Sequence, residues 1–426
     1  FLYGIFFLPS TPLIGILLLL LALIKSISNS KNNLIKDRWN YPLIISIGLI
    51  IFSTINITLL KNLYSYANLD TQIIWFNVFK WVILIVCFIG YQNFLKSNNQ
   101  RTLFVKFLIT GTIPLIISCF LQKFFWNQGP YQILNGLITW YQKPLHISGG
   151  ISGLFSNVNY TGLWLGVTLP FCIALIRTER DRLNKSILFI LIFIFSYFIF
   201  ETTSRNAYLS LIISFIFLMN LRYSIIFISF QISFFIFVKL FSLTEYNLFG
   251  INFNLPIINT ITSLSSSTIN PQDSRLVIFK EALSLVKERP FLGWGASTFN
   301  FNFTNNNLNN LNILNENPYH SHNMPIELAY NFGIPLAILL VTISIMLFFI
   351  SIIKLNKFKL KKEEFLISKA WIISILIILI THLSDITFYE DRIGILITIF
   401  FSGLRCFIKD NKLSNFELKA KSDSHL

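Results

Sequence analysis

Residues 325–353 read PIELAYNFGIPLAILLVTISIMLFFISII, and Lys354 follows them directly. Within this stretch Glu327 is the single charged residue. A transmembrane helix needs about 20 consecutive, mainly apolar residues, and lipid offers no hydrogen-bond partner to a backbone that is not helical. The stretch therefore predicts a helix that spans a membrane, with length to spare.

Similar runs recur along the whole chain. Of its 426 residues 54% are hydrophobic and 12% are charged, and phenylalanine alone occurs 45 times. Ordinary soluble domains are about 25% charged, so the composition predicts an all-α polytopic membrane protein. We predict eleven spans, at residues 5–24, 42–60, 73–94, 102–121, 160–177, 186–201, 206–220, 223–241, 325–353, 366–384 and 393–408.

The chain has a formal net charge of +15, and most of its basic residues lie in loops between these spans. Of 34 Lys and Arg residues, 23 lie in one alternate set of short loops and in the C-terminal tail. The positive-inside rule makes that set cytoplasmic and places residue 1 outside. We therefore expect a further span before residue 1, which gives twelve spans with both ends inside. No nucleic-acid-binding signature accompanies the basic residues, so we expect no nucleic-acid partner.

Spans and loops divide the chain into six parts. Two external loops are long, and loops of such length are usually functional or disordered. The predicted parts are N-terminal transmembrane helices (1–121), a first external loop (122–159), central transmembrane helices (160–241), a large periplasmic loop (242–324), C-terminal transmembrane helices (325–409) and a cytoplasmic tail (410–426).

The large loop contains one predicted helix, Ser274–Arg289, which Pro290 terminates. We expect an amphipathic helix that lies over the bundle or along the membrane interface. The Asn-rich stretch 300–317 is expected to be a mobile connection. The apolar positions at helical spacing are Leu276, Phe279, Leu283 and Val286.

The four cysteines carry no sign of redox or metal chemistry. They lie in or at the ends of apolar runs and form no CxxC pair. We interpret them as packing residues and expect neither a disulfide framework nor a zinc site.

Two arginines are candidates for binding an anion. Arg205 lies between two apolar runs with almost no loop, where a guanidinium is costly unless it faces a cavity, a counter-ion or the headgroup layer. The alternative is an arginine that reaches lipid phosphates. Arg275 opens the predicted loop helix, where backbone N–H groups favour an anion and a guanidinium adds bidentate phosphate recognition. A solvated side chain, or one paired with Asp273, is the alternative there.

His320 and His322 stand just before the stretch quoted first, in the segment Tyr319–Glu327. A neutral imidazole here can take a proton from a hydroxyl, with Asn323 or Glu327 fixing its tautomer. The H-x-H pattern also suits a metal, but the sequence offers no obvious external cluster of further ligands. We place proton transfer first, an ordinary interfacial histidine second and a metal last.

Further positions accompany these groups as supports. Asn159 belongs to the polar segment Gly153–Tyr160, where the first external loop re-enters the membrane. Gly293 and Gly295 flank a tryptophan after the loop helix, and two glycines there permit a tight turn and close backbone approach.

Weaker candidates lie on the last external turn, namely Asp385 and the neighbours Asp391 and Arg392, for which a surface charge pair is the alternative. Together, the candidates present two arginines and a histidine on one side of the membrane, without a carboxylate dyad or a DxD motif. That set suits metal-free chemistry on a diphosphate, in which arginines neutralise the leaving group and histidine activates a hydroxyl.

In their order, these motifs resemble those of the O-antigen ligase and polymerase superfamily of bacterial membrane glycosyltransferases. The resemblance covers about residues 150–340, and the flanking spans match in number and hydrophobicity alone. Asn206 stands where the family commonly has Gly. The matching pieces are Gly153–Tyr160, Thr203–Leu209, Ser274-Arg275 with the helix that follows, Pro290–Gly295, and His322–Glu327 with Gly333.

The resemblance implies a multi-pass enzyme of the bacterial plasma (inner) membrane with its active face in the periplasm. The implied donor is an undecaprenyl-diphosphate-linked glycan, and the acceptor is lipid A-core or another glycan or protein. Arg205 and Arg275 would hold the diphosphate, and His322, which Asn323 follows, would be the base, with His320 as the rival. No cofactor is implied, and the expected reaction is metal-independent inverting transfer.

Several readings remain beside the ligase, which is our first choice. A polysaccharide polymerase or a protein O-glycosyltransferase of the same superfamily would share the donor and differ in the acceptor. A bicarbonate-type transporter would use the basic cavity for an anion, although transporters usually show internal repeats and interrupted helices at the midplane. A non-catalytic subunit of an export assembly would tolerate replacement of the arginines and the histidine.

Overall fold

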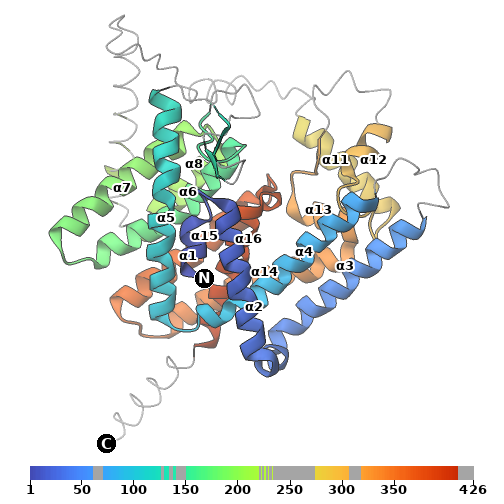
Figure 1. Ribbon diagram of the computed structural model, residues 1–426, viewed down its shortest axis with the longest axis horizontal. Coiled ribbons are helices and arrows are strands. Elements are labelled where there is room, and N and C mark those ends of the chain that lie inside the picture. The colour runs from blue at the N-terminus through green and yellow to red at the C-terminus, as the bar shows by residue number, and fades with distance from the viewer. Residues whose placement is uncertain are drawn as a thin grey trace, which may run out of the picture.

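The computed structural model describes residues 1–60, 71–125, 129–133, 138–140, 150–219, 274–306 and 318–410, with isolated positions between 222 and 233. It is a bundle of long helices with a group of shorter ones at one side (Figure 1). Eight helices in the described ranges are long and apolar enough to cross a membrane. This confirms an all-α polytopic membrane protein. The span predicted at 223–241 lies almost wholly outside the described residues.

Before the large loop, α1 packs on α2, α3 on α4, and α6 on α7 and α8. A two-stranded antiparallel ladder, in which Tyr131 is opposite Trp140, stands in the first predicted external loop. The bounds are α1 (Leu2–Phe7), α2 (Pro12–Lys36), η1 (Arg38–Asn40), α3 (Tyr41–Leu60), α4 (Thr71–Tyr91), η2 (Gln92–Phe94), α5 (Asn98–Phe124), β1 (Tyr131–Ile133), β2 (Ile138–Trp140), α6 (Val158–Thr178), α7 (Arg182–Glu201) and α8 (Arg205–Leu218).

The elements of the C-terminal half include the large loop and the last helices of the bundle. The predicted loop helix is present, one residue shorter than expected. The bounds are α11 (Ser274–Glu288), α12 (Phe299–Asn306), α13 (Met324–Phe332), α14 (Ile334–Lys357), α15 (Lys362–Thr381), η4 (Thr387–Tyr389) and α16 (Asp391–Lys409).

Two further predicted spans form helices that do not meet the criterion of length and composition. α8 has 14 residues, shorter than the bilayer requires. α16 has 19 residues and carries four charged side chains, yet most of its length is buried. α16 is surrounded by neighbouring helices, and charged groups inside a bundle persist where they are paired there. α8 buries one face against α6 and α15 and leaves Leu209, Ile212, Ile216 and Phe217 exposed.

The stretch 325–353 was predicted as one helix, and this is wrong. The chain breaks at Gly333, whose φ is 94°, into the short helix α13 and the long helix α14. A positive φ of this kind favours glycine, and Pro335 in the first turn of α14 donates no backbone hydrogen bond. Because of this break, α13 is a separate short helix and not the first part of α14.

The first predicted span, 5–24, is divided in the same way. α1 ends at Phe7 and α2 begins at Pro12. Pro9 and Pro12 interrupt the helical ladder, because proline lacks the N–H that the ladder needs. α1 therefore packs beside α2 and α5 instead of extending α2.

α6 occupies the centre of the bundle, in contact with α7, α8 and α15. Its small residues Gly162 and Gly166 face Ala207 and Ser210 of α8, where any added Cβ would lie within 2.7 Å of a side-chain atom. Small residues at this spacing let membrane helices approach closely. The close contact fixes the start of α8, and hence Arg205, relative to the start of α6, where Asn159 lies.

At the opposite side of the molecule, α11, α12 and α13 lie together near the ends of α3 and α4 (Figure 1). The buried face of α11 consists of Ile278, Ala282, Leu285 and Val286, while Leu283 is 48% exposed. The predicted apolar face was thus rotated by about one position. The face of α11 that is buried is therefore decided by the segments that pack against it and not by its own apolar pattern alone.

The Asn-rich stretch is partly ordered, so the prediction of a mobile connection over 300–317 is wrong for its first residues. Phe299 and Phe303 are fully buried on α12, and Phe299 packs edge-to-face on Tyr330 of α13 with ring centroids 5.1 Å apart. Asn302 donates to the Tyr330 hydroxyl at 2.7 Å. Two aromatic anchors therefore override the polar composition here, and residues 307–317 lie outside the described ranges.

Candidate active site

The predicted site residues gather at one end of the bundle, around the turn that joins α15 to α16. The central contact joins His322 Nδ1 to Asp385 Oδ1 at 3.3 Å. The other carboxylate oxygen, Oδ2, accepts a hydrogen bond from Asn159 Nδ2 at 2.7 Å. Three segments far apart in sequence thus meet at one buried carboxylate.

Burial alone opposes the ionised form of Asp385, but its neighbours outweigh burial. The hydrogen bond from His322 and the nearby positive charges of His322, His320 and Arg275 hold the pKa of Asp385 below its usual value. The carboxylate is therefore ionised near neutral pH and acts as the acceptor. A hydrogen bond from Nδ1–H to this carboxylate leaves Nε2 of His322 as the basic nitrogen.

His322 has an unusual backbone, with φ at 54°. Residues other than glycine rarely adopt this conformation, which costs on the order of 1–3 kcal/mol and recurs at functional sites. The conformation brings the His320 and His322 rings together edge-to-face, with centroids 4.3 Å apart. Burial and the charge of His322 lower the pKa of His320, which favours the neutral form of that imidazole.

Beneath the histidines lies a second polar group centred on Glu327. Its Oε1 accepts from the Tyr389 hydroxyl at 2.6 Å and from Asn331 Nδ2 at 3.2 Å. Its Oε2 accepts from the backbone N–H of Ser321 at 2.9 Å. Tyr389 in turn stacks on His320 at 5.8 Å between ring centroids. Glu327 therefore holds the backbone between the two histidines.

The structure places Asp385, rather than Asn323 or Glu327, against the His322 ring, so the expected partners of the histidine were wrong. Asn323 begins α13 as its N-cap, accepting from the Ile326 N–H at 3.1 Å. Its amide donates to the Leu383 carbonyl at 2.9 Å. Because its oxygen caps α13 and its nitrogen bonds the turn after α15, Asn323 joins the start of α13 to that turn.

Both predicted arginines belong to this end of the molecule and are exposed. Arg275, at the start of α11, is close enough for its charge to lower the pKa of Asp385. Arg205 is the first residue of α8, and the next residue, Asn206, accepts a hydrogen bond from the Ser384 hydroxyl at 2.9 Å. The starts of α8 and α11 therefore flank the turn that carries Asp385.

Gly293 and Gly295 lie away from the histidines and shape the support of α13. Gly293, with φ at 64°, approaches the Tyr330 carbonyl so closely that a Cβ would lie 2.5 Å from that oxygen. The N–H of Trp294 donates to the same carbonyl at 2.7 Å, and the N–H of Gly295 donates to Asn331 at 2.9 Å. Gly293 and Gly295 therefore let the backbone of this loop bind directly to α13, the helix that carries Glu327.

Arg392 is buried, so the alternative of a surface charge pair with Asp391 is wrong. Its guanidinium bonds Glu390 at 2.5 Å and the Leu154 carbonyl at 3.0 Å, and it lies 4.0 Å from the centre of the Phe155 ring. The neighbouring Asp391 pairs with Lys80 instead. Arg392 therefore fastens the α15–α16 turn to the segment before α6.

The described residues contain one group of side chains that could ligate a metal. The ligand atoms of His320, His322 and Asp385 lie within 4.8 Å of one another, a set of N and O donors that suits zinc after small adjustment. The expectation that no further external ligand joins the H-x-H pattern is therefore wrong, because the fold supplies Asp385 from 63 residues away.

Two positions of the candidate site received little or no weight from the sequence. Asp385 was noted on the last external turn but not assigned to the site, and Tyr389 was not singled out. The signal available was their place in a short polar turn, Ser384–Arg392, between two apolar runs. Polar groups at such a membrane edge are a reason to suspect function.

A family model described as O-antigen ligase matches residues 187–341. The match includes Arg205, Arg275 and both histidines, and it excludes Asn159 and Asp385. It confirms the resemblance drawn from the motifs. No curated protein matches the chain.

Proposed function

We propose, from the premise that residues 187–341 are the O-antigen ligase domain of a membrane glycosyltransferase, that this protein moves a glycan from undecaprenyl diphosphate to an acceptor hydroxyl. The observation that carries the proposal is the His322–Asp385 pair, flanked by Arg205 and Arg275 at one end of the bundle. The first-choice acceptor is lipid A-core, which makes the protein a ligase of lipopolysaccharide biosynthesis.

His322 serves as the general base. As the acceptor oxygen attacks the anomeric carbon of the donor, its proton passes to Nε2 of His322. Asp385, bonded to Nδ1, keeps the ring in the required tautomer and stabilises the imidazolium that forms. His320 stands in edge contact with this ring and remains the rival for the same step.

The two arginines bind the leaving group. The bond between the anomeric carbon and the diphosphate oxygen breaks, and undecaprenyl diphosphate leaves with the electron pair. Guanidinium groups match phosphate oxygens bidentately and stabilise charge that develops as the bond breaks. A single displacement of this kind inverts the anomeric configuration.

The basic loops orient the enzyme. Positive loops at the end opposite the site face the cytoplasm under the positive-inside rule, so the site faces the periplasm across a bacterial inner membrane. In this arrangement the segments 122–159 and 242–324 are the external loops of the six-part organisation, and α11 with α12 forms a cover beside the site.

A transfer assay in proteoliposomes tests the proposal. Wild type, His322→Ala and Asp385→Asn are supplied with undecaprenyl-diphosphate glycan and a panel of acceptors: lipid A-core, the donor glycan itself and a protein substrate. Tyr319→Ala is the matched control, because Tyr319 lies in the same segment and is 82% exposed. We expect transfer by wild type and the control, and strongly reduced transfer by the other two.

The acceptor that reacts distinguishes ligase from polymerase and protein glycosyltransferase. Parallel reactions with EDTA test metal independence, which matters because His320, His322 and Asp385 form a possible ligand set. If EDTA abolished transfer and added zinc restored it, the mechanism would depend on a metal and the metal-free mechanism would be wrong. Normal transfer by a His320→Ala/His322→Ala double variant would remove the histidine base altogether.

A further inference from the structure

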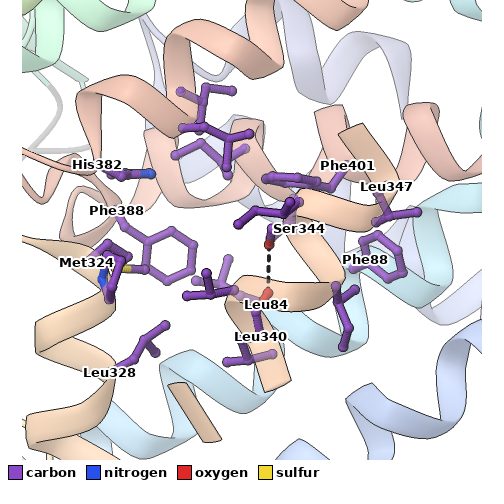
Figure 2. A pocket seen from close by; sticks show the side chains of 18 of the residues that line it. Leu84, Phe88, Met324, Leu328, Leu340, Ser344, Leu347, His382, Phe388 and Phe401 are labelled. Carbon is purple, nitrogen blue, oxygen red and sulfur yellow. Dashed lines mark hydrogen bonds between the residues drawn. The ribbon is translucent and has the colours of Figure 1, made fainter. Parts of the chain in front are cut away.

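An apolar pocket of about 310 Å³ lies inside the bundle beside the candidate site. Its walls come from α4, α13, α14, α15 and α16, and Figure 2 shows side chains from these helices pointing into a common space. Typical ligand pockets measure roughly 300–1,000 Å³. The space is therefore large enough for a ligand, and too small for the whole of a long one.

No side chain in the lining is charged, and its three polar members are already bonded. The Ser344 hydroxyl donates to Leu340 at 2.9 Å, the contact drawn in Figure 2, and Thr398 donates to Ile395 at 2.7 Å. His382 Nε2 contacts the Thr387 hydroxyl at 3.3 Å. The surface of the pocket is therefore almost entirely apolar, and a cavity of this kind favours hydrocarbon over water.

The pocket and the candidate site share two chain segments. Met324, in the pocket wall, follows His322 by two residues, and its N–H donates to the His382 carbonyl at 2.8 Å. Leu383, also in the wall, accepts from Asn323 and precedes Asp385 by two residues. One face of these segments thus carries the polar groups of the site, and the other lines the hydrocarbon pocket.

The pocket also opens toward the outside of the bundle. Two lining residues, Ile345 of α14 and Leu383 after α15, are 42% and 55% exposed. Both stand on or next to helices that are apolar enough to span a membrane. Large exposed apolar side chains on such helices face lipid in a membrane-spanning protein, so this side of the pocket is where a hydrocarbon chain can enter from the bilayer.

We propose that this pocket binds the part of the polyprenyl chain that adjoins the diphosphate of the donor. The inference rests on the proposed function. In such a donor only the diphosphate separates the hydrocarbon from the reacting anomeric carbon. A hydrocarbon pocket directly behind the site therefore fits the donor. A lipid acceptor carries its reacting hydroxyl on a sugar, farther from its own chains. The rest of the polyprenyl chain passes out of the exposed side of the pocket into the bilayer.

The test measures binding separately from transfer. Undecaprenyl diphosphate and a one-isoprene diphosphate analogue are titrated against the full chain in nanodiscs. We expect wild type to bind the long chain at least tenfold more tightly than the short analogue. Ser344→Phe, which places a ring in the pocket, should remove this difference while leaving affinity for the analogue unchanged. Ile338→Phe is the matched control, because Ile338 lies on the same helix, outside the lining, and is 61% exposed.

A second measurement uses wild type alone, so that the test does not depend on a variant that misfolds. An undecaprenyl diphosphate with a photoreactive group on its first isoprene units is cross-linked and mapped by mass spectrometry. Labels on the 340–347 stretch of α14 or on Phe388 and Phe401 support the pocket. Labels confined to the outer surface of the bundle overturn it.

The outcomes separate this inference from the proposed function. Saturable, chain-length-dependent binding without glycan transfer to any acceptor keeps the pocket and removes the function. Normal transfer with no dependence on chain length, or equal affinity of Ser344→Phe and wild type for the long chain, removes the pocket and keeps the function. A Ser344→Phe variant with a raised KM for a lipid acceptor and an unchanged KM for the donor would assign the pocket to the acceptor.

Discussion

Two pairs of arginines, one at each end of the helix bundle, differ in their exposure. At the end that carries the candidate site, Arg205 and Arg275 are exposed, and the ionised Asp385 bonds His322 and Asn159. At the other end, Arg405 is buried and bonds both oxygens of Asp37 at 2.7 and 2.8 Å. Arg205 and Arg275 are therefore accessible to a ligand, whereas Arg405 is bonded within the protein.

The ion pairs of the second end join distant parts of the chain. Asp37 follows α2 and Arg405 lies in α16, while Arg101 of α5 pairs with Asp410 after α16 at 3.2 Å. Breaking a buried pair leaves an uncompensated charge, which is strongly destabilising. These pairs brace the bundle, whereas Arg205 and Arg275 are exposed and remain accessible to a ligand.

The largest effect should follow from the loss of the base. We expect His322→Ala to lower the rate of glycan transfer by about 10²–10⁴-fold, the usual contribution of a positioned general base, with unfolding unchanged. Transfer rate and thermal unfolding are measured on the same preparation. If the loss of transfer rate were accompanied by a matching loss of thermal stability, His322 would be a structural residue, and the two ends of the bundle would not differ in this respect.

The reverse result is expected at the braced end. Arg405→Ala should destabilise the protein by up to about 3–5 kcal/mol, because the buried Asp37 carboxylate loses the guanidinium that bonds both of its oxygens and keeps the exposed Lys409 ammonium, 3.2 Å from Oδ2. The folded fraction should transfer glycan at the wild-type rate. The Asp37→Ala/Arg405→Ala double variant should lose less stability than the sum of the single variants, and strict additivity would show that the pair is not a unit.

Removal of one exposed arginine should affect the donor more than the fold. We expect Arg275→Ala to lower kcat/KM by about 10²–10³-fold, comparable to the loss of one donor to a developing anion. Arg275→Lys should recover part of this loss, since a lysine keeps the charge without the bidentate fork. Unchanged binding of undecaprenyl diphosphate by the Arg205→Ala/Arg275→Ala double variant would remove the arginines from the site.

The smallest expected effect concerns pH and the buried histidine behind the site. Burial lowers the pKa of His382 to about 4, so between pH 6.5 and pH 4 the unfolded chain binds a proton that the folded state does not. Stability should therefore fall as pH falls through this window, by roughly 3 kcal/mol in all. His320, whose pKa is also lowered, acts in the same direction.

Thermal unfolding of wild type and His382→Gln across this pH range checks the assignment. The variant should lose less stability than wild type between pH 6.5 and pH 4. Parallel curves for the two proteins would show that His382 becomes charged in the folded state, which would also weaken the picture of a purely apolar pocket.

Sequence reasoning was strongest where a property depends on residues close together. Ser274 to Arg289 was predicted as a helix and forms α11, because an apolar pattern with a proline after it is a local signal. The same reasoning predicted the wrong buried face for α11 and a single helix in place of α13 and α14. Both the buried face and the break depend on contacts with other segments. The Gly333 break is set by the Pro290–Gly295 loop, whose Phe291 carbonyl would lie 2.0 Å from any Cβ at that glycine.

The sequence by itself determined that the chain is a helical membrane protein and that Arg205, Arg275 and the two histidines are its candidate chemistry. Apolar run length, loop charge and motif order carry that information directly. Only the tertiary structure decided that Asp385 is the partner of His322, that Arg392 is buried and that a hydrocarbon pocket adjoins the site. Each of these depends on which helix ends meet in space, and a linear pattern holds no record of contacts between residues 63 or 226 positions apart.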